Sequence, residues 1–173
     1  MYHLVVPVVI LVVVVISIVL ISLSSSSWFP SQNQLEAHTS RAIVLNCMDF
    51  RLIDDLSRFL DADGYNNNFD EVILAGASLG LMQNTYPEWR PTAIAHIDLA
   101  RKLHHIHEII LVDHMDCGAY KLLYNQSHFT ADEEYALHAQ NLNAAAIELQ
   151  TRYPELKIRK LLMNLDGTVR VIS

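Results

Sequence analysis

Two short apolar runs, each followed at once by residues with reactive side chains, constrain the fold of this chain most strongly. Residues 42–46 read AIVLN and lead into Cys47, and residues 108–113 read EIILVD and lead into His114. Apolar runs of this length, rich in β-branched residues, are typical of strands buried on both faces of a parallel sheet. Because ligand sites form at the carboxyl ends of such strands, we expect both runs to deliver their reactive residues to one place.

The segments around these runs alternate between helical and extended patterns. A capping box that begins at Thr130 predicts a long helix ending near Tyr153. The pair Asp166-Gly167 is a hairpin signal and predicts an antiparallel edge strand after it. In full, we expect helices over 52–60, 92–107, from 119 and over 130–153, and further strands over 71–75, 157–164 and 168–172.

This alternation predicts an α/β fold with a mostly parallel sheet flanked by helices. Right-handed crossovers restrict the possible strand orders, and ligand sites form where the order reverses. We expect the order 2-1-3-4, with strand 5 as an antiparallel edge. It sets the first and third strands side by side, and the positions of Cys47 and His114 are part of the reason for choosing it.

An uncharged segment, residues 4–23, consists almost entirely of Val, Ile and Leu. About 20 apolar residues in a helix cross the ~30 Å hydrocarbon core of a bilayer. The first three residues include no Lys or Arg, and the apolar run is longer than the core of an ordinary signal peptide, which favours an uncleaved anchor. The Ser-rich stretch 22–27 keeps a cleaved signal open as an alternative. A buried core helix is a third interpretation, which the uninterrupted apolarity disfavours.

We therefore divide the chain into a transmembrane anchor or signal segment (1–24), a polar linker (25–40) and a folded domain (41–173). The protein is expected to be membrane-anchored by a single N-terminal span, or secreted if the segment is cleaved. The first basic residue after the span is Arg41, which is too distant to predict an orientation.

Charge and cysteine content exclude two classes of protein. The formal net charge is -7 and no long Lys/Arg run occurs, which argues against a nucleic-acid partner. The chain has only two cysteines, Cys47 and Cys117, which is too few for a disulfide-stapled scaffold. A single disulfide between them is an alternative to the use proposed next.

The reactive residues make up a set of metal ligands. Zinc prefers Cys sulfur and His nitrogen, and a catalytic zinc keeps three protein ligands and one open position. Cys47, His114 and Cys117 would supply such a Cys₂His set, with two of the ligands on one turn. The softness of these ligands favours Zn²⁺ as the cofactor. Alternatively, the two cysteines are small core residues.

An acidic and a basic residue follow the first cysteine in the pattern Cys-x-Asp-x-Arg. Asp49 is placed to accept a hydrogen bond from zinc-bound water, and Arg51 can hold Asp49 ionised because an adjacent cation lowers a carboxylate pKa by about 1–3 units. Deprotonated water on zinc is a strong nucleophile, and we expect it to attack a small carbon centre. Alternatively, Arg51 forms an ordinary surface ion pair.

Other polar residues near the motifs have two interpretations each. Asp113 and Asp116 are candidate hydrogen-bond partners of the motif histidine, or they only solvate a loop. His104, His105 and His107 form a second metal site, or they are solvated residues at a helix end, where the dipole favours them.

Together, CMDFR and HMDCG resemble the β-class carbonic anhydrases, over most of the predicted domain. The resemblance implies that Cys47, His114 and Cys117 hold zinc, and that zinc-bound hydroxide attacks CO₂ to form bicarbonate reversibly. It also implies that Asp49 and Arg51 orient the hydroxide, and that Asp49 is a fourth zinc ligand in the closed state of some members. Homodimers or larger homo-oligomers are expected, with the site near the subunit interface.

The chain departs from this family in one loop. Many members carry Arg-Asn-Ala-Gly-Asn after the second strand; aligned on Ala75-Gly76, this chain has Ile73, Leu74 and Ala77 at the other places. The fold and ligand set are also similar to hydrolases of carbonyl sulfide and carbon disulfide, gases that an apolar loop suits. Three alternatives therefore stand beside CO₂ hydration: hydrolysis of these gases, a catalytically inactive zinc-binding module, and a metal-free Cys–His nucleophile.

Overall fold

The structure is a computed structural model and describes residues 38–173. The predicted anchor or signal segment (1–24), and the predicted linker up to residue 37, lie outside the described residues. Within residues 38–173, none of the helices combines the length and the apolar composition that a bilayer crossing requires.

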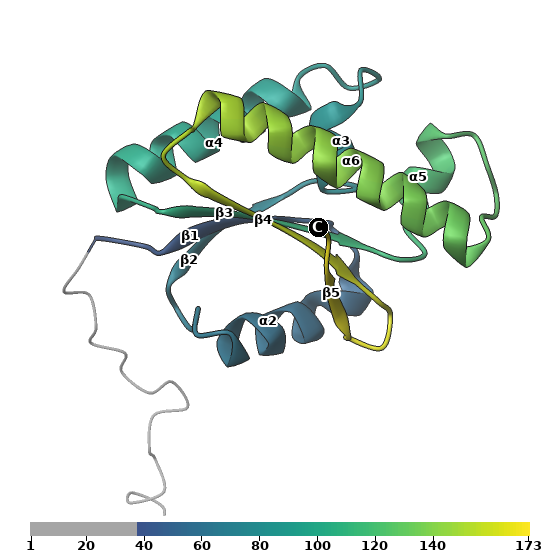
Figure 1. The fold of residues 1–173 in the computed structure, drawn as a ribbon, viewed down its shortest axis with the longest axis horizontal. Helices are drawn as coiled ribbons and strands as arrows, with labels where there is room; N and C mark the ends of the chain where they lie inside the picture. Colours follow the sequence, from purple (N-terminus) through teal and green to yellow (C-terminus); the bar gives the residue numbers. More distant parts are fainter. Residues whose placement is uncertain (1–37) are drawn as a thin grey trace, which may run out of the picture. The chain divides into compact units, whose positions relative to one another are not determined.

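The described residues contain a five-stranded sheet in the predicted order, β2-β1-β3-β4-β5 (Figure 1). The first four strands are parallel, and β5 pairs antiparallel with β4. The sheet order and the α/β class are therefore confirmed. The strands are β1 (Ala42–Asn46), β2 (Phe69–Ile73), β3 (Glu108–His114), β4 (Lys157–Met163) and β5 (Val169–Val171).

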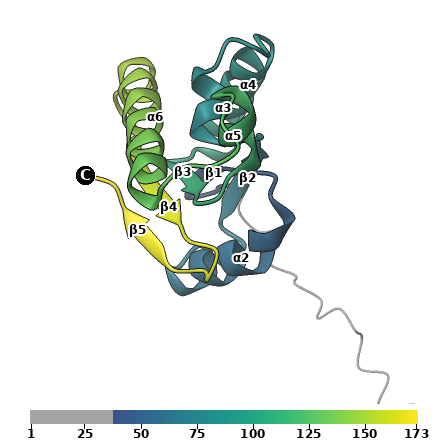
Figure 2. The same ribbon diagram turned by 90° about the vertical axis from the view of Figure 1, so that its right-hand side faces the viewer.

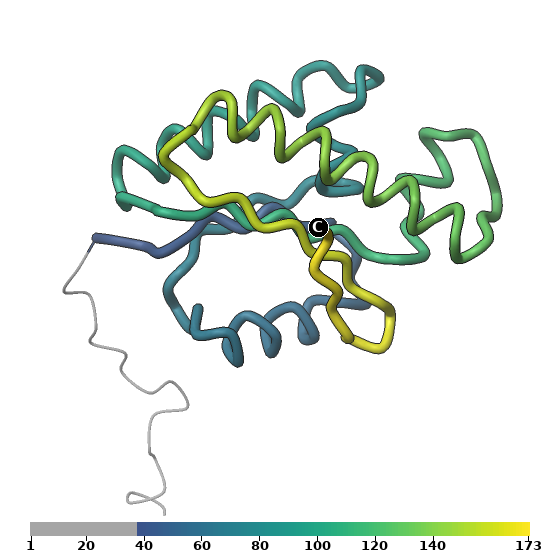
Figure 3. The backbone as a smooth tube through the Cα atoms, viewed as in Figure 1, coloured from purple at the N-terminus to yellow at the C-terminus, as the bar shows by residue number. Residues whose placement is uncertain are grey.

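Helices cover both faces of the sheet (Figure 2). One face carries α2, and the other carries α4 and α6 together with the short α3 and α5 (Figure 1). The tube view shows the chain leaving β1, running back beneath the sheet as α2 and returning through β2 (Figure 3). The helices are α2 (Ile53–Ala62), α3 (Ser78–Met82), α4 (Trp89–His104), α5 (Gly118–Leu123) and α6 (Ala131–Arg152).

The two central strands build two separate cores because successive residues of a strand point to opposite faces. In β3, Ile109 and Leu111 pack with the α4 and α6 side. Ile110 and Val112 pack with the α2 side. All seven residues of β3 are buried, which explains why its sequence is a continuous apolar run and not an alternating one.

The observed elements differ from the expected ones in several places. β2 begins and ends two residues before the predicted range 71–75, and α4 begins and ends three residues before the predicted range 92–107. α4 ends where His105 adopts a left-handed backbone conformation, with φ of 54°. α3 was not expected at all, because its five residues show no helical periodicity and include Gly80.

The capping box at the start of α6 is confirmed. Thr130 Oγ1 accepts a hydrogen bond from the backbone N–H of Glu133 at 3.3 Å. In return, Glu133 Oε2 accepts one from the backbone N–H of Thr130 at 2.8 Å. This reciprocal pair satisfies two N–H groups that a helix N-terminus otherwise leaves without partners.

Candidate metal centre

Three side chains that are far apart in the sequence meet at the carboxyl end of the sheet. Cys47 follows β1, His114 ends β3, and Cys117 precedes α5. Their ligand atoms lie within 4.8 Å of one another, and the two sulfurs are 3.9 Å apart. They meet because β1 and β3 are neighbours in register, with Asn46 opposite Val112.

The imidazole of His114 presents one nitrogen to this cluster. Its Nδ1 lies 2.9 Å from the backbone carbonyl oxygen of Met115, which can only accept a hydrogen bond, so Nδ1 carries the proton. Nε2 is buried and has no hydrogen-bond partner among residues 38–173. A buried nitrogen with a lone pair and no partner fits a metal ligand, because such an atom is otherwise costly to bury.

The two sulfurs are electrostatically linked. A hydrogen bond donated by Cys117 is the largest influence on Cys47 and lowers the pKa of its thiol to about 4, with help from the Gly76 N–H at 3.3 Å. The same shared proton raises the pKa of Cys117. Two thiols therefore share one proton, and a bound divalent cation would let both ionise, which fits zinc better than a hard, oxygen-preferring ion.

Asp49 and Arg51 lie beside the cluster as a bidentate pair. Arg51 Nε donates to Asp49 Oδ1 at 2.9 Å, and Nη2 donates to Asp49 Oδ2 at 2.7 Å. These bonds from Arg51 are the largest influence on the carboxyl and lower the pKa of Asp49 to about 2. Asp49 Oδ2 lies 3.7 Å from His114 Nε2, so the carboxylate borders the cluster.

A second carboxylate, Asp116, binds the other side of the same guanidinium. Arg51 Nη1 donates to Asp116 Oδ2 at 2.8 Å, and Lys121 also contacts Asp116. The Arg51 guanidinium is therefore held between two carboxylates, whereas an isolated surface ion pair would involve only one. Of the two interpretations of Asp116, the one that makes it a hydrogen-bond partner of His114 is wrong, because the imidazole is bonded to the carbonyl of Met115.

Asp113 does not bind the imidazole either. Its buried carboxylate accepts hydrogen bonds from Ser78, Tyr120 and His138. His138 and Ser78 were missed as site-related residues, because no spacing in the sequence connects them to the motifs. Tyr120 was missed in the same way, and its hydroxyl donates to Asp113 Oδ2 at 2.6 Å.

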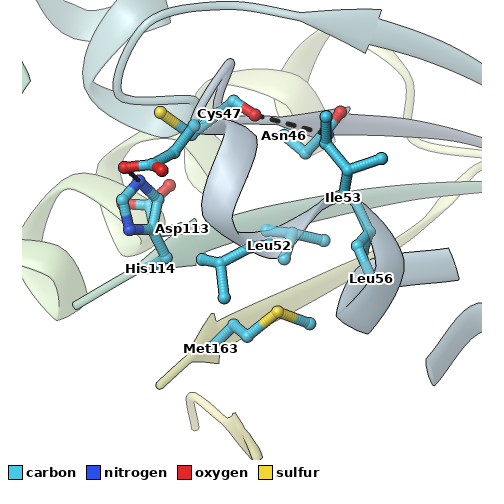
Figure 4. Close-up of a pocket in the computed structure, with 10 residues that line it drawn as sticks. Asn46, Cys47, Leu52, Ile53, Leu56, Asp113, His114 and Met163 are labelled. Atoms are coloured by element: carbon cyan, nitrogen blue, oxygen red, sulfur yellow. Dashed lines mark hydrogen bonds and ion pairs between the residues drawn. The ribbon is translucent and has the colours of Figure 1, made fainter. Parts of the chain in front are cut away.

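A small cavity of about 30 Å³ opens beside the cluster (Figure 4). A buried water needs about 10–15 Å³ by this measure, so the space fits one small molecule of two or three heavy atoms. In Figure 4, Cys47 and His114 lie on the left of the space, while Ile53 and Leu56 lie on the right. The apolar part of the lining consists of Leu52, Ile53, Leu56, Val112 and Met163.

The loop that departs from the family pattern keeps a backbone contact with the cluster. Gly76 has φ of 77°, a conformation that favours glycine, and its N–H donates to Cys47 Sγ. Leu74 packs against the core, and Ile73 is about half exposed. The loop thus supplies an amide to a sulfur but no polar side chain from positions 73, 74 and 77.

The three-histidine group does not form a second metal site. Across residues 38–173, no group of three potential ligands other than Cys47, His114 and Cys117 comes together. His104 Nδ1 instead pairs with Asp70, 2.8 Å from Oδ2.

Comparison with known proteins places the chain in a family. Residues 37–173 match the family described as "Putative carbonic anhydrase". The chain belongs to this family. Two similar relatives are uncharacterized proteins from Rickettsia conorii, 40% identical over 131 residues, and from Rickettsia bellii, 37% identical over 131 residues. Each match covers 75% of this chain, and they cover 70% and 80% of the respective relatives.

Solved structures of carbonic anhydrases share the fold of this family member. A carbonic anhydrase from Glaciozyma antarctica is 16% identical, with a TM-score of 0.55, covering 84% of this chain and 89% of that chain. A β-carbonic anhydrase from Trichomonas vaginalis is also 16% identical, with a TM-score of 0.55, and the match covers 93% of this chain and 96% of that chain. A tetrameric β-carbonic anhydrase from Sordaria macrospora is 14% identical, with a TM-score of 0.52, and the match covers 78% of this chain and 81% of that chain. These likenesses show the β-carbonic-anhydrase fold, as the sequence motifs predicted.

Proposed function

We propose that this protein is a zinc enzyme that reversibly hydrates carbon dioxide to bicarbonate. The observation that carries the proposal is a Cys₂His cluster bordered by an ionised carboxylate, with Asp49 Oδ2 3.7 Å from His114 Nε2. Family membership supports the same activity. When bound, zinc supplies a Lewis acid that lowers the pKa of water to about 7.

The residues of the chain have distinct roles in this proposal. Cys47, Cys117 and His114 would hold the ion through two sulfurs and Nε2. Asp49 Oδ1 accepts hydrogen bonds from both the backbone N–H and Nε of Arg51, so the carboxylate has one fixed orientation. Oδ2 would then accept a hydrogen bond from the attacking water and so direct the lone pair of that water away from the carboxylate.

The shape of the cavity fits the substrate. The apolar lining disfavours bulk water and admits a small, uncharged, linear molecule such as CO₂. The same lining supports a second candidate, hydrolysis of carbonyl sulfide or carbon disulfide, which are also small and linear but more apolar.

We also propose a homodimer or larger homo-oligomer, held to a membrane by residues 1–24. The apolar side chains Met48, Phe50, Ile53 and Ile73 are each more than half exposed around the carboxyl ends of β1 and β2. Clustered exposed apolar residues mark interaction surfaces. Light scattering on the purified protein tests the assembly, and a monomer at micromolar concentration would contradict it.

The decisive experiment measures metal and turnover in one preparation of the full chain. Elemental analysis should give about one zinc per chain, and stopped-flow CO₂ hydration should be lost in Asp49→Ala with the zinc retained. Asp54→Ala is the matched control, because Asp54 is an exposed aspartate five residues further along and does not line the cavity.

Each result has a clear meaning. Zinc with CO₂ hydration supports the proposal. Zinc with sulfide release from carbonyl sulfide, and no CO₂ hydration, moves the function to the second candidate. Zinc without turnover on any of these gases indicates an inactive metal-binding module. A folded protein without zinc contradicts the metal site itself, and Cys47 would then be the candidate nucleophile.

A further inference from the structure

A buried polar cluster lies directly behind the candidate metal ligands. Its centre is the carboxylate of Asp113, which is 1% exposed. Around it lie Ser78, Tyr120 and His138, each 0% exposed, and Glu134, 7% exposed. We refer to these five residues as the Asp113 hub. They come from β3, α3, α5 and α6, four elements that pack together at this end of the sheet.

The carboxylate at the centre is fully satisfied by protein donors. Asp113 Oδ1 accepts the Ser78 backbone N–H at 2.9 Å. Asp113 Oδ2 accepts the Ser78 hydroxyl at 2.6 Å, the Tyr120 hydroxyl at 2.6 Å and His138 Nδ1 at 2.9 Å. A buried carboxylate is tolerated only with such partners, so the positions of these donors are tightly coupled to that of Asp113.

One arm of the hub reaches Cys47. Ser78 is separated by one residue from Gly76, whose N–H donates to Cys47 Sγ at 3.3 Å. The residue between them, Ala77, has φ of 44° and ψ of -102°, which is a strained conformation for a residue with a Cβ. Such strain persists only where the surroundings hold it. Here, the two hydrogen bonds between Ser78 and Asp113 hold the loop in the position that aims the Gly76 amide at the sulfur.

The other arms reach Cys117 and His114. Glu134 Oε1 accepts the backbone N–H of Cys117 at 3.1 Å and lies 3.8 Å from His138 Nε2. Tyr120 is three residues beyond Cys117, on the first turn of α5. Asp113 itself directly precedes His114, so a movement of its backbone moves the imidazole. All three candidate ligands are thus connected to one carboxylate.

We propose that the Asp113 hub positions the three ligand segments for metal binding, with Asp113, Ser78, Tyr120, His138 and Glu134 as positioning residues. The inference rests on the proposed zinc site. Residues that orient metal ligands typically change metal affinity about 10–100-fold when they are mutated. A cluster that only stabilises the fold would lower stability without selectively weakening metal affinity.

Two tyrosines provide a matched comparison between these possibilities. Tyr120 and Tyr65 are both 0% exposed, and the hydroxyl of each donates to a buried carboxylate. Tyr120 donates a hydrogen bond to Asp113 in the hub. Tyr65 donates one to Glu108, which lies at the start of β3, six residues from His114. Tyr120→Phe and Tyr65→Phe therefore each remove a hydrogen bond from a buried tyrosine to a carboxylate, but only Tyr120 belongs to the hub.

The test uses the full chain and two probes that do not depend on turnover. Zinc affinity is measured by competition with a chromophoric chelator, and ligand geometry by the absorption spectrum of the Co²⁺-loaded protein. We expect Tyr120→Phe and Ser78→Ala to weaken zinc binding by about tenfold or more and to alter the Co²⁺ spectrum. Asp113→Asn should have a larger effect, and Tyr65→Phe should bind zinc within about twofold of the wild type.

Equal zinc affinities and spectra for the Tyr120→Phe and Tyr65→Phe proteins would overturn the proposal. If Asp113→Asn does not fold, Tyr120→Phe and Ser78→Ala still decide the question. The outcome is also separable from the proposed function. A chain that binds zinc in a hub-dependent way but does not hydrate CO₂ would contradict the enzyme activity and leave the role of the hub supported.

Discussion

Arg51 offers the sharpest test of how the candidate site works. Its charge could keep Asp49 ionised, whereas its planar shape could orient the Asp49 carboxylate, and these two roles predict different results. Its bonds to Asp49 hold the pKa of that carboxyl at about 2, below the ordinary 3.8. At pH 7, a carboxyl with pKa 3.8 is protonated in only roughly one molecule in a thousand. Loss of Arg51 therefore leaves Asp49 ionised at neutral pH, so the contribution of Arg51 there must be orientation of the carboxylate.

The size of that contribution follows from the bonds that would be lost. Arg51→Gln removes two charge-assisted bonds to Asp49, of 2.9 and 2.7 Å. A hydrogen bond to a charged group contributes about 1.5–3 kcal/mol. Because the Arg51 side chain is 35% exposed, solvent screening weakens both hydrogen bonds, and we use about 1.5–3 kcal/mol for the two bonds together. This corresponds to a loss of roughly 10–100-fold in CO₂ hydration.

Arg51→Lys separates orientation from charge, because lysine keeps the charge but cannot form the two-pronged contact. We expect Arg51→Lys to lose nearly as much activity as Arg51→Gln, with an unchanged pH profile between pH 7 and 9 in stopped-flow assays at equal zinc content. Arg58→Gln is the matched control, since Arg58 is exposed and pairs with Asp55 away from the cluster. Full activity in Arg51→Lys, or a shifted pH profile in Arg51→Gln, would refute the orientation argument.

Three further predictions concern stability and the free thiols. Leu111→Ala should lower the free energy of unfolding by about 2–5 kcal/mol in urea titrations, because Leu111 is 0% exposed; a loss below 1 kcal/mol would contradict the buried position. Thr130→Ala should cost about 1 kcal/mol by loss of the capping box, and Thr130→Ser much less, so equal losses would argue against the cap. After metal removal by a chelator, iodoacetamide at pH 6 should modify Cys47 before Cys117, because the pKa of Cys47 is lowered to about 4 and that of Cys117 is raised. Mass spectrometry of the labelled peptides checks this order. Added zinc should protect both cysteines from modification.

Local sequence patterns predicted most strands and the start of α6, because apolar runs and helix caps depend on residues that are close together in the sequence. The bounds of β1 and the start of β3 were predicted from continuous apolar runs, and the α6 capping box from four residues at fixed spacing. The strand order followed from general rules for parallel sheets together with the two motifs. The approach of Cys47, His114 and Cys117 could also be predicted, since parallel strands end at the same edge.

Only the tertiary structure determined how the site is supported. No local pattern predicts that Asp116 binds Arg51, or that Asp113 binds Ser78 and His138. The helix α3 and the strained Ala77 before it were likewise missed, because their conformation depends on bonds to a strand 35 residues further along the chain. A short segment with weak intrinsic preference adopts whatever conformation its distant partners stabilise. The candidate ligand set could therefore be predicted from the sequence, whereas the groups that hold these three residues in place became visible only in the packed structure.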